Sequence, residues 1–116
     1  MRIAIPLDEN KKDVCIVFAR APYFLIRDGK EDIVMENPAA AAHGGAGLQA
    51  AQFLVDQGIN ALITVRCGEN AAEVFEAAEI KVYKSADVNA AENLAALEEG
   101  KLSELTEFHS GYHGIQ

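Results

Sequence analysis

The N-terminal third of the chain carries its apolar residues in short runs, a spacing typical of β-strands. Residues 2–6 predict one strand, and the apolar run 14–18 fits either a short strand or a packed turn. Segment 22–38 has two runs of aromatic and β-branched residues around Asp28-Gly29, a pair that tolerates the positive φ of a tight turn. This segment therefore predicts a β-hairpin.

From residue 47 onward, helical spacing alternates with apolar runs. The pattern predicts, in order, a helix over 47–57, a strand over 60–65, a helix that starts near Asn70, a strand over 80–84 and a helix that starts near Asn89. The strand over 60–65 is almost wholly apolar, as expected where both faces of a strand are covered. Lysines in the strand over 80–84 suit the edge of a sheet.

Two pairs of residues fit capping boxes, in which a polar side chain caps a helix and an acidic residue three positions later completes the cap. Asn70 with Glu73 predicts the start of the second helix, and Asn89 with Glu92 predicts the start of the third. A hairpin followed by right-handed crossovers gives a mixed sheet. The sequence thus predicts an α/β fold, with a mixed five-stranded sheet flanked by helices.

The end of the chain has little apolar periodicity. We expect a domain over residues 1–105 and a mobile or loosely docked tail over 106–116. His109 and His113 lie four residues apart in this tail, but the glycine between them disfavours a helix that would bring them together. We expect both histidines to be solvated and dispensable for folding, with a loose metal site as the alternative.

The composition is that of a globular protein, because half of the 116 residues are hydrophobic and 24% are charged. The formal net charge is −8, from 10 basic and 18 acidic residues, and only Lys11 and Lys12 approach a basic patch. Phosphate contacts supply most of the affinity for nucleic acids, so we expect no nucleic-acid partner.

No apolar run approaches the roughly 20 residues that cross a membrane, and residues 1–10 lack the pattern of a signal peptide. We therefore expect a cytoplasmic protein with no membrane partner and with reduced cysteines. The oligomeric state stays open.

A histidine and three glycines precede the first predicted helix, at His43, Gly44, Gly45 and Gly47. Such a loop leaves the first amides of the helix open, and a helix N-terminus favours an anion. The spacing matches neither the dinucleotide fingerprint nor the phosphate loop. Because the helix dipole supplies only about 0.3–1 kcal/mol at an exposed site, a plain flexible turn is an equal alternative.

Cys67 follows the strand over 60–65 and precedes the second helix. Loops after parallel strands gather at one edge of a sheet, where ligands bind. A helix N-terminus and Arg66 would lower the pKa of this thiol, whereas Glu69 would raise it. The alternative is a small buried hydrophobic residue, which is the reading we prefer for Cys15 in its apolar run.

Four segments carry a resemblance to a known family. They are Arg20-Ala21-Pro22-Tyr23-Phe24, Glu36-Asn37-Pro38, Gly44-Gly45-Ala46-Gly47 and Asn70-Ala71. In order and spacing these segments resemble the dinitrogenase iron–molybdenum cofactor family, which includes NifX-like proteins and the C-terminal domain of NifB. The resemblance implies a ribonuclease-H-like fold and a protein that binds or carries an iron–sulfur or molybdenum-containing cluster without catalysis. Its partners would be metal-cluster donor and acceptor proteins.

The chain departs from the family at Val17-Phe18-Ala19, where cluster-binding members often have His-Phe-Gly. A histidine ligand is therefore absent at position 17. We expect His43 and Cys67 to serve as the metal ligands and to face each other across the sheet edge. The predicted cluster-binding residues are Arg20, His43, Gly44, Gly45, Gly47 and Cys67.

Two other functions stay open. A ribonuclease-H-like nuclease needs carboxylates at strand ends to hold a divalent metal. Asp8 follows the first predicted strand, but the strand over 60–65 is followed by no acidic residue before Glu69. A regulatory or scaffold module without a ligand is the other alternative.

Overall fold

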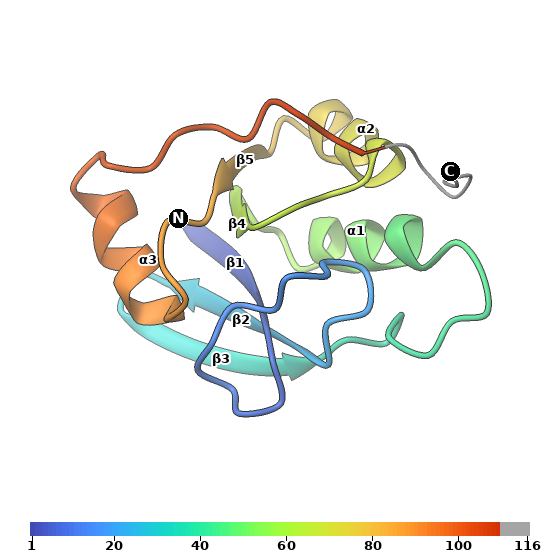
Figure 1. The fold of residues 1–116 in the computed structure, drawn as a ribbon, viewed down its shortest axis with the longest axis horizontal. Helices are drawn as coiled ribbons and strands as arrows, with labels where there is room; N and C mark the ends of the chain where they lie inside the picture. Colours follow the sequence, from blue (N-terminus) through green and yellow to red (C-terminus); the bar gives the residue numbers. More distant parts are fainter. Residues whose placement is uncertain (110–116) are drawn as a thin grey trace.

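Five strands form one mixed sheet in the computed structural model, which describes residues 1–109 (Figure 1). The strands are β1 (Arg2–Leu7), β2 (Tyr23–Asp28), β3 (Glu31–Glu36), β4 (Ala61–Thr64) and β5 (Lys81–Lys84). Their order across the sheet is β3-β2-β1-β4-β5. The β1–β2 and β2–β3 pairs are antiparallel, and β4 is parallel to both β1 and β5. Consequently β1, β3 and β4 all end at the same edge of the sheet.

The predicted hairpin and the predicted interior strand are both confirmed. Asp28 pairs with Glu31, and Gly29 has the positive φ of 64° that the tight turn requires. All of β4 is buried, and β5 forms an edge of the sheet as its lysines indicated. The first strand was predicted over residues 2–6, ending at Pro6; it continues one residue further, to Leu7.

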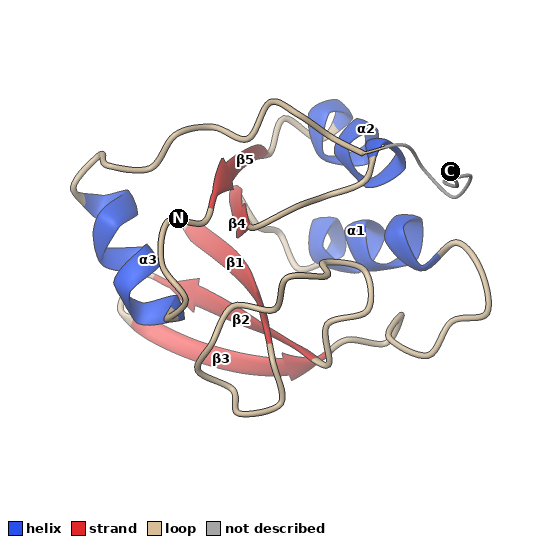
Figure 2. Ribbon diagram, viewed as in Figure 1, coloured by secondary structure: helices blue, strands red, loops and turns tan. Residues whose placement is uncertain are grey.

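Three helices cover the two faces of the sheet, as Figure 2 shows. They are α1 (Ala46–Asp56), α2 (Glu69–Ala77) and α3 (Ala90–Glu98). The α1–α2 core lies between these two helices and one face, and includes Phe24, Leu54, Leu62 and Phe75. The α3 core lies on the opposite face and includes Ile5, Leu7, Ile63 and Leu94. Within residues 1–109, no helix is long and apolar enough to cross a membrane.

The two predicted helix caps have different outcomes. The Asn89 side chain accepts a hydrogen bond from the amide of Glu92 at 3.0 Å, so the cap by Asn89 is confirmed. Glu92 does not complete a capping box, because the Asn89 amide donates to Asp87 Oδ1 at 2.9 Å. The prediction for Asn70 is wrong, because α2 begins one residue earlier, at Glu69, and its cap is Gly68. Gly68 has no side chain that could satisfy the first amides of the helix.

After α3, residues 102–109 run back along the edge strand β5, and we call this segment the C-terminal strap. The amide of Lys84 donates to Ser103 O at 2.8 Å, and the amide of Leu105 donates to Val82 O at 2.9 Å. Leu105 and Phe108 also pack against the α1–α2 core. Packing therefore continues beyond the domain boundary expected after residue 105, up to His109, whereas His113 lies outside the described residues.

The other outer strand of the sheet, β3, is largely exposed. Ile33 and Val34 at its centre have exposed fractions of 42% and 43%. Acidic residues lie on both sides of this apolar pair, at Glu31 and Asp32 before it and at Glu36 after it.

Candidate functional site

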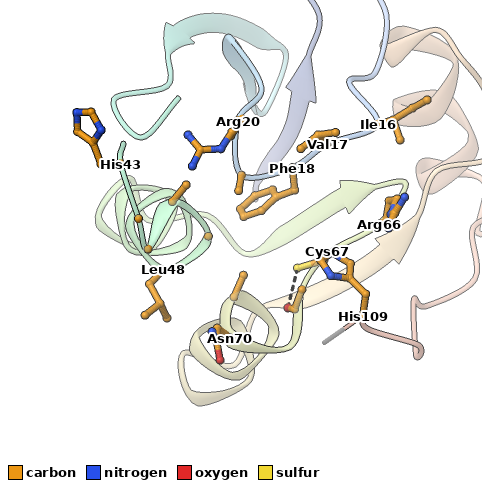
Figure 3. Close-up of a pocket in the computed structure, with 17 residues that line it drawn as sticks. Ile16, Val17, Phe18, Arg20, His43, Leu48, Arg66, Cys67, Asn70 and His109 are labelled. Atoms are coloured by element: carbon orange, nitrogen blue, oxygen red, sulfur yellow. Dashed lines mark hydrogen bonds between the residues drawn. The ribbon is translucent and has the colours of Figure 1, made fainter. Parts of the chain in front are cut away.

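A pocket of about 790 Å³ lies at the edge of the sheet where β1, β3 and β4 end (Figure 3). Its lining comes from residues 16–20, 43–48 and 66–68, together with Asn70, Ala71 and His109. The structure brings to this one pocket all six residues that the sequence singled out for cluster binding, namely Arg20, His43, Gly44, Gly45, Gly47 and Cys67. Their shared location is a structural fact, and their roles stay predictions.

The start of α1 opens into the pocket. Its cap, Gly45, has a left-handed backbone with φ of 67°, and no side chain caps the helix. The first amide that finds an acceptor is that of Gln49, which donates to Gly45 O at 3.0 Å. Among the residues that the structure describes, the amides of the first helical turn, at Ala46, Gly47 and Leu48, have no acceptor.

The start of α2 lies beside it and opens into the same pocket. A methyl group added at Gly47 would lie 4.0 Å from the Cβ atom of Ala71, so the two helix ends are in near contact. In the described part of the chain, the amides of Asn70 and Ala71 have no acceptor. The amide of Glu69 instead donates to His109 O at 2.9 Å. Five open amides thus converge from two helix N-termini.

The charged side chains around these amides are those of two arginines. Arg20, Arg66, His43 and His109 line the pocket, and none of its described lining residues is acidic although the chain has 18 acidic residues. The Arg20 guanidinium donates from Nη1 to Ala40 O at 3.1 Å and to Ala42 O at 2.8 Å. Arg20 therefore both contributes charge and holds the loop that leads into α1.

The rim of the pocket is apolar. Ile16, Val17 and Leu48 line it with exposed fractions of 58%, 54% and 46%. Leu48 is not among the buried residues of α1, which are Ala46, Ala50, Ala51 and Leu54. Leu48 lies in the first turn, beyond the sheet, and so reaches the pocket instead.

Cys67 is buried, with an exposed fraction of 1%, and belongs to the α1–α2 core. Its Sγ donates a hydrogen bond to Gly68 O at 3.5 Å. Burial raises the pKa of the thiol to about 12, because a thiolate loses its hydration there. The expected lowering of this pKa by Arg66 and the helix end is therefore wrong: removal from water outweighs both.

His43 and Cys67 do not face each other. Figure 3 shows them at opposite ends of the pocket, with the His43 ring turned away from Cys67. The imidazole near Cys67 is that of His109, which lies against Gly68, the next residue. Within residues 1–109, no three His, Cys, Asp or Glu side chains form a group that could hold a metal ion.

Cys15 takes part in neither core. It is half-buried, and its thiol donates to Val17 O at 3.5 Å. Burial is the largest cause that raises its pKa, and hydrogen bonding to Asp8 adds to the increase. The expectation that Cys15 is a core residue is wrong, and Cys15 does not line the pocket.

The sequence model of the family described as dinitrogenase iron-molybdenum cofactor matches residues 1–100. The chain belongs to this family. The resemblance carried by the four sequence segments is thereby confirmed. A comparison with curated proteins finds no match.

Solved structures of similar proteins support this assignment. The apo form of the orange protein from Desulfovibrio gigas is 26% identical, with a TM-score of 0.83 over 90% of this chain and 92% of that chain. A candidate NifB protein from Thermotoga is 41% identical, with a TM-score of 0.75 over 92% of this chain and 95% of that chain. A candidate dinitrogenase protein from Methanocaldococcus jannaschii, 22% identical with a TM-score of 0.71 over 92% of this chain and 96% of that chain, shows the shared fold alone. The family and these neighbours fit a small protein that binds or carries a metal cluster.

Sequence reasoning missed the apolar rim and His109. A signal for His109 was present, because Leu102, Leu105 and Phe108 recur every three residues in the segment that we expected to be a tail. Leu102 packs against the α3 core, and the other two pack against the α1–α2 core. This spacing could have predicted a docked segment that brings His109 to the pocket.

Proposed function

We propose that this protein is a non-catalytic carrier for an anionic metal–sulfur cluster of the iron–sulfur or iron–molybdenum type, bound where α1 and α2 begin. One observation carries the proposal. Five open amides and two arginines surround a pocket whose described lining has no acidic residue, in a chain with a net charge of −8. An anion is the cargo that this arrangement favours.

The hydrogen bonds that the open amides can donate are strong enough, taken together, to bind an anion at micromolar concentration. Hydrogen bonds to charged groups contribute about 1.5–3 kcal/mol each. A micromolar complex needs roughly 8 kcal/mol, so several of the five amides acting together are of the required order. The helix dipole by itself, which contributes about 0.3–1 kcal/mol, is not.

The available donors suit a cluster that arrives already assembled. A site that builds a cluster from single ions needs several thiolate ligands, and no group of three candidate ligands occurs among residues 1–109. A preformed cluster brings its own sulfides, which the amides and Arg66 can hydrogen-bond and Ile16, Val17 and Leu48 can contact. We propose Cys67 and His43 as supplementary ligands from the two ends of the pocket.

A cluster bound mainly by hydrogen bonds and charge can be passed on, so the proposed partners are cluster donor and acceptor proteins in the cytoplasm. Purification without oxygen, followed by measurement of iron, molybdenum, copper and sulfide per chain, identifies the cargo. A chain that contains none of these metals after expression in a cluster-producing host contradicts the proposal.

A titration tests the site directly, with tetrathiomolybdate as a defined metal–sulfur anion. Arg66→Gln removes one positive charge from the pocket lining, and Lys30→Gln removes one from the exposed turn of the hairpin. We expect Arg66→Gln to weaken binding about tenfold, the equivalent of 1.4 kcal/mol, and Lys30→Gln to leave it unchanged. Equal effects of the two variants would mean that net charge, and not the pocket, attracts the anion.

The strand order β3-β2-β1-β4-β5 supports the proposed ribonuclease-H-like classification. A nuclease function on such a fold is the less favoured alternative. It would require grouped carboxylates for metal ions, and Asp8 has no such group around it in the described part of the chain. Cleavage of an RNA–DNA hybrid that is lost in Asp8→Asn would favour the nuclease.

A further inference from the structure

The C-terminal strap ends on the residues that begin α2. The amide of His109 donates to Cys67 O at 3.3 Å, and His109 O accepts from the amide of Glu69 at 2.9 Å. These two bonds form a parallel bridge between His109 and Gly68. The strap therefore occupies the Glu69 amide at the start of α2, next in sequence to the open amides of Asn70 and Ala71.

The His109 side chain completes this contact. A methyl group added at Gly68 would lie 3.1 Å from the Cε1 atom of the imidazole, so the ring rests on the Gly68 backbone. Cys67, the preceding residue, has an exposed fraction of 1%. The strap thus adds to the cover that keeps the Cys67 thiol from water, and the raised pKa of this thiol is consistent with that cover.

The last part of the strap buries few of its side chains. Thr106, Glu107 and His109 are exposed, and Phe108 is the one partly buried side chain among residues 106–109. Earlier in the strap, Leu105 is fixed separately by its hydrogen bond to Val82. Segments with few buried contacts open more easily than the rest of a fold. Residues 106–109 can therefore separate while Leu105 stays paired with β5.

We propose that residues 106–109 form a releasable cover over Cys67 and the start of α2, so that the pocket has a closed and an open form. In the closed form the five open amides and the arginines bind the cargo. In the open form the Glu69 amide becomes a sixth donor, and Cys67 can ligate a metal, its proton passing to solvent as the sulfur–metal bond forms. The use of the open form for cargo rests on the proposed function, whereas the cover itself does not.

Thiol labelling tests the cover in a Cys15→Ser background, in which Cys67 is the only remaining cysteine. The rate of reaction with Ellman's reagent is measured on the folded protein without cargo. Phe108→Ala removes the anchor and should raise the rate at least tenfold, whereas Thr106→Ala changes an exposed residue of the same segment and should not. An unchanged rate in a folded Phe108→Ala protein overturns the proposal.

A second variant keeps Phe108 in place. Gly68 has φ of −78° and ψ of 161°, which alanine adopts freely, so Gly68→Ala displaces the His109 ring without straining the backbone. It too should accelerate labelling. Cadmium ion alone serves as the ligation probe. A cadmium–thiolate absorbance should develop in the Phe108→Ala protein and be absent from the protein that also carries Cys67→Ser. Faster labelling without this absorbance would show that the open form does not make Cys67 a ligand, and would overturn that part of the proposal.

These measurements are separable from the test of function. A parent protein that binds no tetrathiomolybdate contradicts the carrier function, and the labelling rates still decide whether the cover exists. Labelling that is equally slow in all variants contradicts the cover and leaves the binding of tetrathiomolybdate as a separate result.

Discussion

The N-terminus of α3 and those of α1 and α2 are completed in different ways. At α3, the Asn89 side chain accepts from the Glu92 amide, and Glu92 adds a negative charge in the first turn. At α1, the cap is a glycine with no side chain, and the first turn contains no acidic residue. At α2, the cap is also a glycine, and within residues 1–109 the one amide of the first turn that has an acceptor is that of Glu69, which donates to the C-terminal strap.

Helix ends normally satisfy their first amides with a cap or with water. The chain contains a working cap at α3, so the open ends of α1 and α2 do not reflect a lack of suitable residue types. Both open ends lie at the pocket, and the capped end belongs to the helix on the other face of the sheet. The difference supports the proposal that the open amides at α1 and α2 bind a ligand.

The largest expected effect is on stability and concerns the strap, which supplies the acceptor for the Glu69 amide at the start of α2. Deletion of residues 107–116 removes Phe108 from the core and both hydrogen bonds of His109. We expect the free energy of unfolding to fall by about 2–4 kcal/mol, which lowers the melting temperature by roughly 10 °C in thermal unfolding. Deletion of 110–116 removes none of these contacts and is the control. Equal melting temperatures for the two deletions would mean that the strap adds nothing to the stability of α2.

The next effect is on binding, and compares two equivalent positions. Gly44 and Val88 each precede the cap residue of a helix, at α1 and α3 respectively. Aspartate fits at both, because Gly44 has open space around it and Val88 is 70% exposed. Gly44→Asp should weaken tetrathiomolybdate binding at least about tenfold, or 1.4 kcal/mol, by placing a like charge at the open end. Val88→Asp should leave the affinity for tetrathiomolybdate unchanged. Similar losses of affinity in the two variants would mean that the N-termini of α1 and α3 do not differ in anion binding.

A smaller effect is expected for the capped helix. Asn89→Ala leaves the Glu92 amide without its acceptor and should lower the free energy of unfolding by about 1 kcal/mol. The affinity for tetrathiomolybdate should not change, because α3 lies on the other face of the sheet. Urea unfolding and the binding titration check the two halves of this prediction. A loss of affinity would show that the two faces are coupled.

The smallest expected effect on the free energy of unfolding near neutral pH comes from ionisation of Cys67. Burial raises the pKa of its thiol from the ordinary value of 9.0 to about 12 in the folded protein. Below pH 9 the thiol is protonated in both states; above it the unfolded state ionises first, so stability falls as the pH rises toward 12. The difference in unfolding free energy between the parent and Cys67→Ala should therefore narrow between pH 9 and 11 in urea. If this difference in unfolding free energy does not change with pH, the thiol is not shielded from water in the folded protein.

Most of the fold could be predicted because its signals are local. The turn at Gly29, the wholly apolar β4 and the cap at Asn89 each depend on a few adjacent residues. The start of α2 was misplaced because Asn70 and Glu73 fit a capping box in sequence, whereas the backbone turns into the helix at Gly68. The pattern of adjacent residues does not show at which of them the backbone enters the helix.

The candidate site was predictable in position but not in detail. Residues at strand ends and helix starts meet by topology, which is why His43 and Cys67 line one pocket. Their orientations depend on packing: Cys67 lies inside the α1–α2 core, and the His43 ring turns outward. The pKa of Cys67 could not be predicted either, because burial exceeds the effect of neighbouring charge, and burial depends on contacts distant in sequence such as the strap.

The exposed edge at β3 determines how two copies of the chain can meet. If two β3 strands paired antiparallel about Ile33 and Val34, Glu31 of each copy would lie opposite Glu36 of the other. Like charges in directly opposed positions destabilise such a pair. The acidic residues therefore disfavour pairing of two copies through this apolar edge. Concentrated samples of the parent should therefore remain dispersed, and a chain with glutamine in place of Glu31 and Glu36 should assemble through β3 more readily.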